Sequence, residues 1–169
     1  MSTVTAQLLA GLLNQHGSRL ELLARQWCNS PADVVQDALV ELAAQPAVPE
    51  NLLGWLYRVV RNRAIDASRR DQRRRRHETA AGGLGRAWFE PATDSRLDAA
   101  VVGECLARLP PDERDVVTLH LWSGLSFEEI AQVVGLSSST VHRRYHAGLA
   151  TLRQALEVSC PTTKKTLRT

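Results

Sequence analysis

The stretch SFEEIAQVVGLSSSTVHRRYHAGLATLRQALE, residues 126–157, has the pattern of two helices joined by a tight turn. Ser126 and Glu129 have the spacing of a capping box, which satisfies two backbone N–H groups at a helix start. Gly135 suits the left-handed residue that ends such a helix, and Ser137 can cap the next one. In this second helix apolar residues recur at helical spacing and form one buried stripe, made of Val141, Tyr145, Leu149, Leu152 and Leu156.

The face of the second helix opposite this stripe carries hydroxyl, imidazole and guanidinium groups. Such groups can contact phosphates and base edges from a helix in the major groove. Because the small residues Ala131 and Gly135 allow a close helix crossing, the stretch predicts a DNA-binding helix-turn-helix. A plain helical hairpin with a solvated outer face is the alternative. The outer residues are Ser138, Ser139, His142, Arg143 and His146, with Arg144 at the margin.

Composition indicates a soluble, all-α protein of one domain or two small ones. Hydrophobic residues make up 44% of the 169 residues, enough for a buried core, whereas aromatics are few at 5% and strand-like alternation is scarce. No apolar run approaches the roughly 20 residues of a membrane span, and the start lacks a secretory signal. Cys28, Cys105 and Cys160 form no CxxC pair. They favour a reducing, cytoplasmic location over a disulfide frame or zinc site.

Positive charge is concentrated in one segment, residues 58–76. It holds nine arginines against two aspartates, a net charge of +7 in a chain whose formal net charge is +3, so the other residues sum to −4. A cationic stripe on an otherwise acidic protein points to a polyanionic partner. Favourable interaction with the dipole at a helix C-terminus would need only a few of these arginines, so nucleic-acid binding is the better account.

Two helices are predicted before this segment. Residues 5–27 form one helix, or a pair broken near Gly17. Ser30 and Pro31 suit the start of the next helix, which carries an acidic outer surface. That surface is either only solvated or a docking face for a basic protein partner. The expected core residues are Leu9, Leu12, Leu13, Leu20, Leu23 and Trp27 in the first helix and Val34, Val35, Ala38, Leu39 and Leu42 in the second.

The longest predicted helix runs from Asn51 to about Arg75. Its apolar stripe comprises Leu52, Leu53, Leu56, Val59, Val60, Ala64 and Ala67. Trp55 and Tyr57 lie beside the arginines and could stack on unpaired bases, a contact worth roughly 1–3 kcal/mol per base. A buried, structural Trp55 is the alternative.

Glycine and the loss of helical period predict a linker over residues 77–96. It separates an N-terminal domain, residues 5–76, from a C-terminal domain, residues 97–157. In the second domain Pro110 ends one helix and Pro111 starts the next. Residues 158–169 are predicted to be a disordered tail.

Together these segments resemble the extracytoplasmic-function group of bacterial RNA polymerase sigma factors, in the sigma-70 family. PADVVQDALVEL, residues 31–42, resembles the acidic helix that binds the polymerase clamp, and GWLYRVVRNRAIDASRR, residues 54–70, resembles the promoter-melting helix. Residues 106–156 (LARLPPDERDVVTLHLWSGLSFEEIAQVVGLSSSTVHRRYHAGLATLRQAL) resemble its C-terminal helix-turn-helix. The family usually has a Phe-Arg-Gly-x-x-Ser-Phe loop before the melting helix, whereas this chain has PAVPENLLG at residues 46–54.

The resemblance implies three sets of binding residues. Asp33, Gln36, Asp37 and Glu41 would bind core polymerase. Trp55, Tyr57, Arg58, Arg61, Asn62, Arg63, Asp66, Arg69 and Arg70 would contact the minus-ten DNA, with Asn62 reading a base and Arg63, Arg69 and Arg70 binding phosphate. Ser138, Ser139, Thr140, His142, Arg143, Arg144 and His146 would contact the minus-thirty-five element.

The resulting prediction is an alternative sigma factor without catalysis, cofactor or metal. Its partners would be core RNA polymerase (the beta and beta-prime subunits), double-stranded and melted promoter DNA, and, as a further candidate, an anti-sigma factor, in the nucleoid-containing cytoplasm and without membrane insertion. A stand-alone helix-turn-helix regulator is the alternative. A metal nuclease would use His142 and His146, which have a metal-binding spacing, but no Asp, Glu or Cys nearby in the sequence completes that site.

Overall fold

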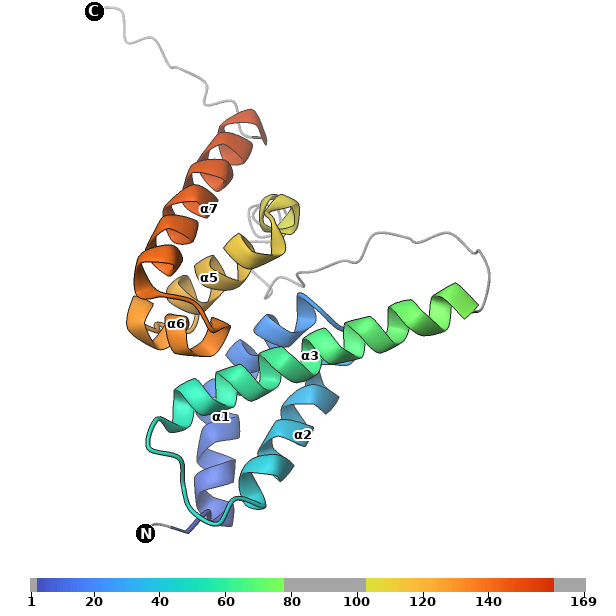
Figure 1. Cartoon of the computed structure of the whole chain (residues 1–169), viewed down its shortest axis with the longest axis vertical. Coiled ribbons are helices and arrows are strands. Elements are labelled where there is room, and N and C mark those ends of the chain that lie inside the picture. Colours follow the sequence, from blue (N-terminus) through green and yellow to red (C-terminus); the bar gives the residue numbers. More distant parts are fainter. Residues whose placement is uncertain (1–2, 78–102, 160–169) are drawn as a thin grey trace, which may run out of the picture.

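The computed structural model describes residues 3–77 and 103–159, called the N-terminal half and the C-terminal half below. All regular secondary structure in these two ranges is helical, which confirms the predicted all-α class (Figure 1). The predicted linker and tail lie outside the described residues except at their first one or two positions, so the predicted domain boundaries stay predictions.

The first helix, α1 (Ala6–Arg25), is continuous. It begins at Thr5, whose hydroxyl accepts a hydrogen bond from the backbone N–H of Leu8 at 3.2 Å. Gly17 does not break it. The prediction that Leu13 lies in the core is wrong, because 44% of this residue is exposed. Its side chain lies instead over the bare backbone of Gly17, where a Cβ would stand 3.2 Å from Leu13 Cδ1.

The next two helices complete a three-helix bundle with α1. In α2 (Pro31–Ala43), Ser30 occupies the N-cap position but its side chain makes no capping hydrogen bond, so Pro31 fixes the first turn. In α3 (Leu52–His77), the Asn51 carbonyl oxygen Oδ1 accepts from the Gly54 N–H at 2.9 Å. The buried residues of α2 and α3 include Val35, Ala38, Leu42, Leu56, Val60 and Ala64, as the helical period predicts.

The C-terminal half contains a helical segment at 103–108, then α5 (Pro111–Leu121), α6 (Phe127–Val134) and α7 (Ser138–Ser159). The predicted capping box is present: Ser126 N–H donates to Glu129 Oε2 at 2.8 Å, and Glu129 N–H donates to Ser126 Oγ at 3.3 Å. Gly135 ends α6 with φ 72°. The helix-turn-helix geometry that its sequence predicts is thereby confirmed.

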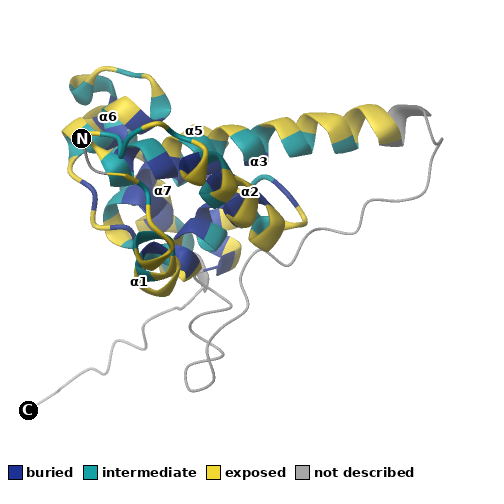
Figure 2. Cartoon of the chain, turned by 90° about the horizontal axis from the view of Figure 1, so that it is seen from below, coloured by how far each residue is buried: buried dark blue, intermediate teal, exposed yellow. Residues whose placement is uncertain are grey.

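The two halves pack against each other rather than standing apart. The α6 helix lies on α3, and α5 contacts α1 (Figures 1 and 2). One buried apolar cluster runs through both halves, so they share a core. Among the described helices, none has the length and apolar character needed to cross a bilayer.

Candidate nucleic-acid interface

Hydroxyl side chains make the hydrogen bonds at the first turn of α7. Ser137 Oγ accepts from the Thr140 N–H at 3.2 Å and lies 2.8 Å from Thr140 Oγ1, and Ser138 Oγ donates to Glu128 Oε1 at 3.3 Å. Ser139 is exposed and shares the Ser137 hydroxyl at 3.1 Å. These contacts fix the start of α7. They leave hydroxyl groups at its N-terminal end, which is the end that a recognition helix presents to a groove.

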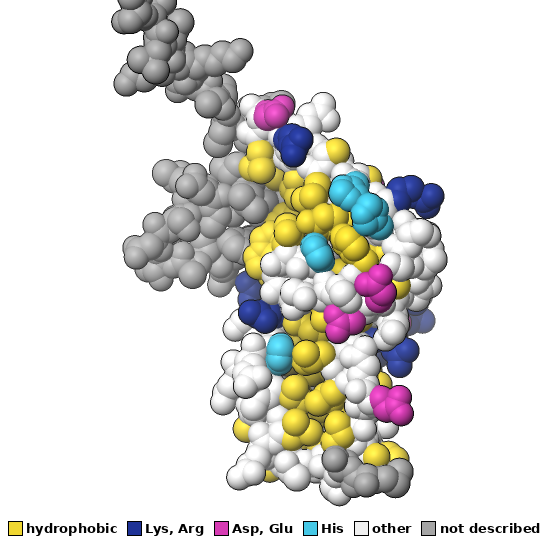
Figure 3. All heavy atoms as spheres, turned by 90° about the vertical axis from the view of Figure 1, so that its left-hand side faces the viewer, with side chains coloured by type: hydrophobic (Ala, Val, Ile, Leu, Met, Phe, Trp, Pro, Cys, Tyr) yellow, Lys and Arg dark blue, Asp and Glu magenta, His cyan; other side chains and the backbone are white. Residues whose placement is uncertain are grey.

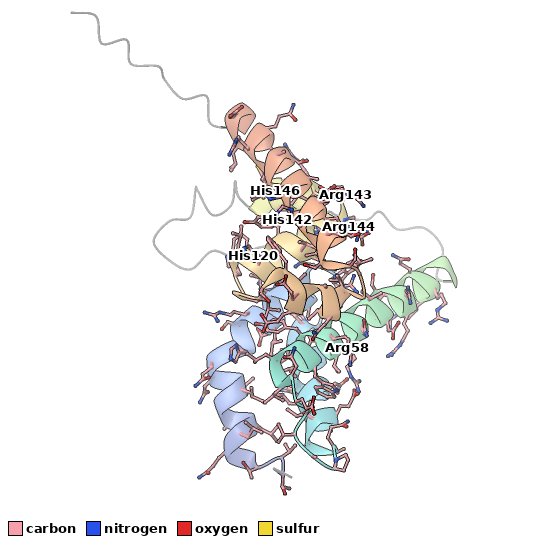
Figure 4. All side chains as sticks on the ribbon, turned by 60° about the vertical axis from the view of Figure 1, so that its left-hand side comes forward. Arg58, His120, His142, Arg143, Arg144 and His146 are labelled. Atoms are coloured by element: carbon pink, nitrogen blue, oxygen red, sulfur yellow. The ribbon has the colours of Figure 1, made fainter. Side chains whose placement is uncertain are left out.

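Three histidines lie along one side of the helix-turn-helix (Figures 3 and 4). His142 and His146 are exposed, with their Nε2 atoms 3.1 Å apart. His120 stacks on Phe127 at 4.6 Å between ring centroids, and the His142 ring meets the edge-on Phe127 ring at 5.1 Å. The Phe127 ring therefore contacts two of the three imidazole rings, those of His120 and His142.

The two arginines of α7 have different environments. Arg143 is exposed, and no ion pair of its side chain is present among the described residues. Arg144 is half-buried and pairs with Asp112 of α5, Nη1 to Oδ2, at 3.0 Å. Arg144 thus helps to hold α7 on α5, and a phosphate would have to compete with Asp112 for it.

The outer part of α3 projects from the bundle and carries the cationic stripe (Figure 2). Arg69 and Arg70 are exposed there, and Arg58 and Asn62 are exposed nearer the start of the helix. Asp66 is also exposed and pairs weakly with Arg69 at 3.4 Å. Asp66, Arg69, Arg70, Gln72 and Arg73 line one side of a hollow along this part of the helix. This geometry can bind a polyanion along the helix through several phosphate contacts.

Tyr57 does not lie beside these arginines on the surface, and the prediction that it stacks on bases is wrong for this conformation. Its side chain is fully buried, because it shares the inward face of α3 with Leu56 and Val60. Burial raises the pKa of Tyr57, and the nearby Ser123 hydroxyl offsets part of that rise. Trp55 is half-buried and packs at the edge of the core, between its two predicted roles.

Arg61 and Arg63, both predicted to bind DNA, are held by carboxylates. Arg61 Nε donates to Asp115 Oδ2 at 2.7 Å, and its side chain is 14% exposed. Arg63 Nη2 lies 2.6 Å from Glu41 Oε2, and Arg63 Nη1 lies 3.6 Å from Asp37 Oδ2. The structure therefore does not place these two guanidinium groups with the exposed arginines of α3.

The residues of the acidic surface of α2 lie on the outer face of that helix, as its helical period predicts. Asp33, Gln36 and Asp37 are exposed, and Glu41 is half-buried beside them. Val40, on the same surface, is 69% exposed. The Arg63 contacts tie this surface to α3 and neutralise part of its charge.

Sequence reasoning missed Asp115 and its contact with Trp27. Asp115 is fully buried, and its Oδ1 accepts from the Trp27 indole N–H at 3.0 Å. The signal was an aspartate directly before the apolar pair Val116 and Val117 in a predicted helix, a position that faces inward. No group of three or more metal-binding side chains occurs within residues 3–77 and 103–159, so the histidine pair has no third ligand there.

Two family models match the chain in succession. The model described as sigma-70 region 2 matches residues 12–75, and the one described as sigma-70, region 4 matches residues 100–152. Together they cover well over half of the sequence, and they correspond to the bundle α1–α3 and to the helices around the helix-turn-helix.

Curated relatives and solved structures agree with these matches. The chain is 32% identical over 156 residues to the ECF RNA polymerase sigma factor SigE of Mycolicibacterium smegmatis, covering 86% of this chain and 60% of that protein. It is 31% identical over 114 residues to SigK of Mycobacterium tuberculosis, covering 63% of this chain and 59% of that protein. The chain thus spans about six tenths of the length of these relatives.

Among solved structures, CnrH in complex with the cytosolic domain of CnrY is similar with a TM-score of 0.66 and 27% identity, covering 92% of both chains. The sigma factor RpoE in complex with the anti-sigma factor NepR from Bartonella quintana is similar with a TM-score of 0.74 over 92% of this chain and 100% of that one. Because the identity is 23%, this second likeness establishes the fold alone.

Proposed function

The chain belongs to the sigma-70 family of bacterial RNA polymerase sigma factors, and on that basis we propose that it is an alternative sigma factor of the extracytoplasmic-function group. In this role it binds core polymerase and directs initiation at promoters with minus-ten and minus-thirty-five elements. The observation that carries the proposal is that both family regions occur, in this order, on one chain. Polymerase performs the chemistry, and this chain is no enzyme.

Three surfaces of the protein would bind core polymerase, minus-ten DNA and minus-thirty-five DNA, respectively. The acidic surface of α2, with Asp33, Gln36, Asp37 and Glu41, would bind the beta and beta-prime subunits of polymerase. The stripe on α3, with Arg58, Asn62, Asp66, Arg69 and Arg70, would bind minus-ten DNA, double-stranded and then melted. The outer face of α7, from Ser138 to His146, would enter the major groove at the minus-thirty-five element.

Promoter-dependent transcription tests this function. Transcription start sites are first mapped after overexpression of the protein, and the promoters found in this way serve as templates. Purified protein is then added to core polymerase on these templates, and run-off transcripts are measured. A transcript that needs both the protein and the mapped promoter is the expected result. If no template yields such a transcript and the protein does not comigrate with core polymerase, the proposed function is wrong.

A stand-alone regulator is the second candidate, favoured only by the helix-turn-helix itself. Asp33→Lys with Asp37→Lys distinguishes the two, because reversing the charge of the α2 surface abolishes polymerase binding by a sigma factor and leaves duplex binding through α7 intact. Glu104→Lys with Glu157→Lys is the matched control: both glutamates are exposed, and both lie in the C-terminal half.

The proposal extends to location and to regulation. A factor that serves polymerase works in the nucleoid-containing cytoplasm. CnrH was solved with the cytosolic domain of CnrY, and RpoE with the anti-sigma factor NepR. These two complexes support an anti-sigma protein as a further partner of this chain, which co-purification from the native host would identify.

A further inference from the structure

Two exposed histidines, His142 and His146, lie one turn apart on the outer face of α7 (Figure 4). Their rings converge: the two Nε2 atoms are 3.1 Å apart, and the ring centroids are 4.3 Å apart. Histidines four positions apart on a helix can bind one metal ion together. Two imidazoles whose nitrogens meet in this way therefore form either a hydrogen bond or a chelate for a cation.

The separation of the two nitrogens fits two ligands of one ion. A zinc-like divalent cation binds an imidazole nitrogen at roughly 2.0–2.1 Å. Two such nitrogens lie about 2.9 Å apart when they meet the ion at a right angle, and about 3.3 Å apart at the tetrahedral angle. The observed 3.1 Å lies between these two values. Both rings can therefore bind one ion after small side-chain rotations.

Packing fixes the turn of α7 that carries both histidines. Val141 is fully buried at the start of this turn, and Arg144 within it pairs with Asp112 of α5 at 3.0 Å. The ring of His142 also meets the Phe127 ring at 5.1 Å between centroids. Because the helix and one of the two rings are already held, binding of an ion orders little additional structure, and the pair is preorganised.

The donor set decides which cations the pair accepts. In the part of the chain that the structure describes, no third histidine, cysteine, aspartate or glutamate joins the two imidazoles. Imidazole suits Cu²⁺, Ni²⁺ and Zn²⁺, and the affinity of a nitrogen site is highest for Cu²⁺, whereas Mg²⁺ and Ca²⁺ prefer oxygen ligands. Water would complete the coordination, so the ion would exchange with solvent at the surface of α7.

We propose that His142 and His146 form a binding site for one late first-row divalent cation, Cu²⁺, Ni²⁺ or Zn²⁺. The alternative is a hydrogen bond alone, in which one imidazole donates to the other. A cation that uses both Nε2 atoms also withdraws them from base edges, so metal and minus-thirty-five duplex compete for this face. The competition rests on the proposed function, whereas the metal site does not.

Copper binding tests the site directly. Untagged protein that carries Cys160→Ser, since thiolates also bind these cations, receives one equivalent of Cu²⁺. Pulsed electron paramagnetic resonance then counts the coordinated imidazoles, and calorimetry with Ni²⁺ gives the affinity. We expect two imidazoles in this parent protein and at most one in His146→Gln. Ni²⁺ should bind about a hundredfold more weakly to His146→Gln, because a chelate has become a single contact.

His146→Ala with Ala147→His is the matched control. Both positions are exposed and the number of histidines is unchanged, but the second imidazole moves about 100° around the helix, away from His142. This variant should bind Ni²⁺ as weakly as His146→Gln, whereas His16→Gln in α1 should bind like the parent. Equal affinity in the parent and the shifted variant, or one coordinated imidazole in the parent, overturns the site and leaves the hydrogen bond alone.

A second experiment tests the competition, using a duplex that contains the minus-thirty-five element of a mapped promoter. Saturating Ni²⁺ should weaken duplex binding by the parent protein at least about tenfold, and the duplex should lower the Ni²⁺ affinity by the same factor. A chelator should restore duplex binding, and binding by His146→Gln should not respond to Ni²⁺.

The outcomes of the two experiments are separable. Duplex binding that Ni²⁺ leaves unchanged or makes tighter overturns the competition. If the parent protein binds none of the mapped duplexes even without metal, the proposed function fails instead, and the count of coordinated imidazoles still decides whether His142 and His146 bind a cation.

Discussion

Gly148 lies where α7 crosses α5, with no room for a side chain. A Cβ built on it would stand 2.8 Å from Val117 Cγ2 and 3.4 Å from Glu113 Cβ, inside a well-packed interface. The glycine at this position of α7, two residues after His146, is thereby explained by packing: the bare backbone lets the two helices approach closely. This requirement depends on the tertiary fold and could not be predicted from helical period alone.

Gly148→Ala should therefore destabilise the protein by about 1–2 kcal/mol, because overpacking at a tight contact exceeds the gain in helix propensity. Gly11→Ala is the matched control in α1, where no atom lies within 4 Å of the added Cβ. It should stabilise the protein by up to about 1 kcal/mol. Chemical denaturation measures both, and equal effects would contradict the close contact at Gly148.

Asp115 gives the docked state a dependence on pH. Burial raises the pKa of this carboxyl, Arg61 of α3 lowers it in part, and Arg114 of α5 contributes in the same direction as Arg61. A group whose pKa is raised in the docked state binds its proton more tightly there. Its stabilising contribution is therefore complete below the ordinary aspartate pKa of about 4, and it is lost as the pH rises through the raised pKa.

Arg61→Gln should make this dependence visible. Without the arginine the pKa of Asp115 rises further, so the variant should be open at neutral pH and should dock again on acidification, when the carboxyl takes up its proton. Distances between spin labels at Ser18→Cys in α1 and Arg153→Cys in α7, both exposed positions, measured over a range of pH, report this change. Arg61→Gln with Asp115→Asn lacks the carboxyl and should remain docked throughout; a transition of the same size in the double variant would exclude Asp115 as its origin.

At the scale of elements, helix starts differ in how much their caps contribute. Ser126 makes the complete capping box of α6, whereas Ser30 occupies the corresponding position of α2 without a side-chain hydrogen bond. Ser126→Ala should cost about 1 kcal/mol of unfolding free energy, and Ser30→Ala close to zero. Thermal unfolding followed by circular dichroism compares the two variants. A loss at Ser30 as large as that at Ser126 would contradict the cap assignment.

The outer face of α7 offers a second comparison within one element. If Arg143 contacts a phosphate at the minus-thirty-five element, Arg143→Gln should weaken binding to all duplexes and reduce the slope of log affinity against log salt by about 1. Arg153→Gln, exposed further along the same helix, should leave the slope unchanged. Fluorescence anisotropy over a range of salt concentrations measures both slopes, and equal slopes would remove Arg143 from the proposed interface.

Local signals explain why the elements could be predicted from the sequence. Caps, the glycine turn at Gly135 and the helical period all act within a few residues, and α6 and α7 follow them closely. For a residue at the margin of an apolar stripe, the helical period does not decide whether its side chain is buried. Tyr57 lies one position from Leu56, and only the bundle decides that both face inward. The ion pair of Asp115 could not be predicted from local signals, because its partner Arg61 lies more than fifty positions earlier.

At the scale of the whole molecule, the sequence predicts two helical units but not their docking. Each unit has its own periodic stripes, and the surfaces that join them are extensions of those stripes rather than a separate motif. The predicted contact sets for polymerase, minus-ten DNA and minus-thirty-five DNA remain predictions. The structure adds that one of their members, Arg61, lies between the units instead of on an open face.

A shared core has a consequence for unfolding. Since buried residues of α2, α3, α5 and α6 belong to one cluster, loss of either half exposes apolar surface of the other, and the two should unfold together. Hydrogen exchange of amides in α2 and in α5, measured over a range of denaturant, should give one common opening free energy for the parent protein. In Arg61→Gln the halves separate first, so α2 and α5 should open with different free energies. Different values in the parent protein would mean that each half folds independently and that the ion pair only orients them.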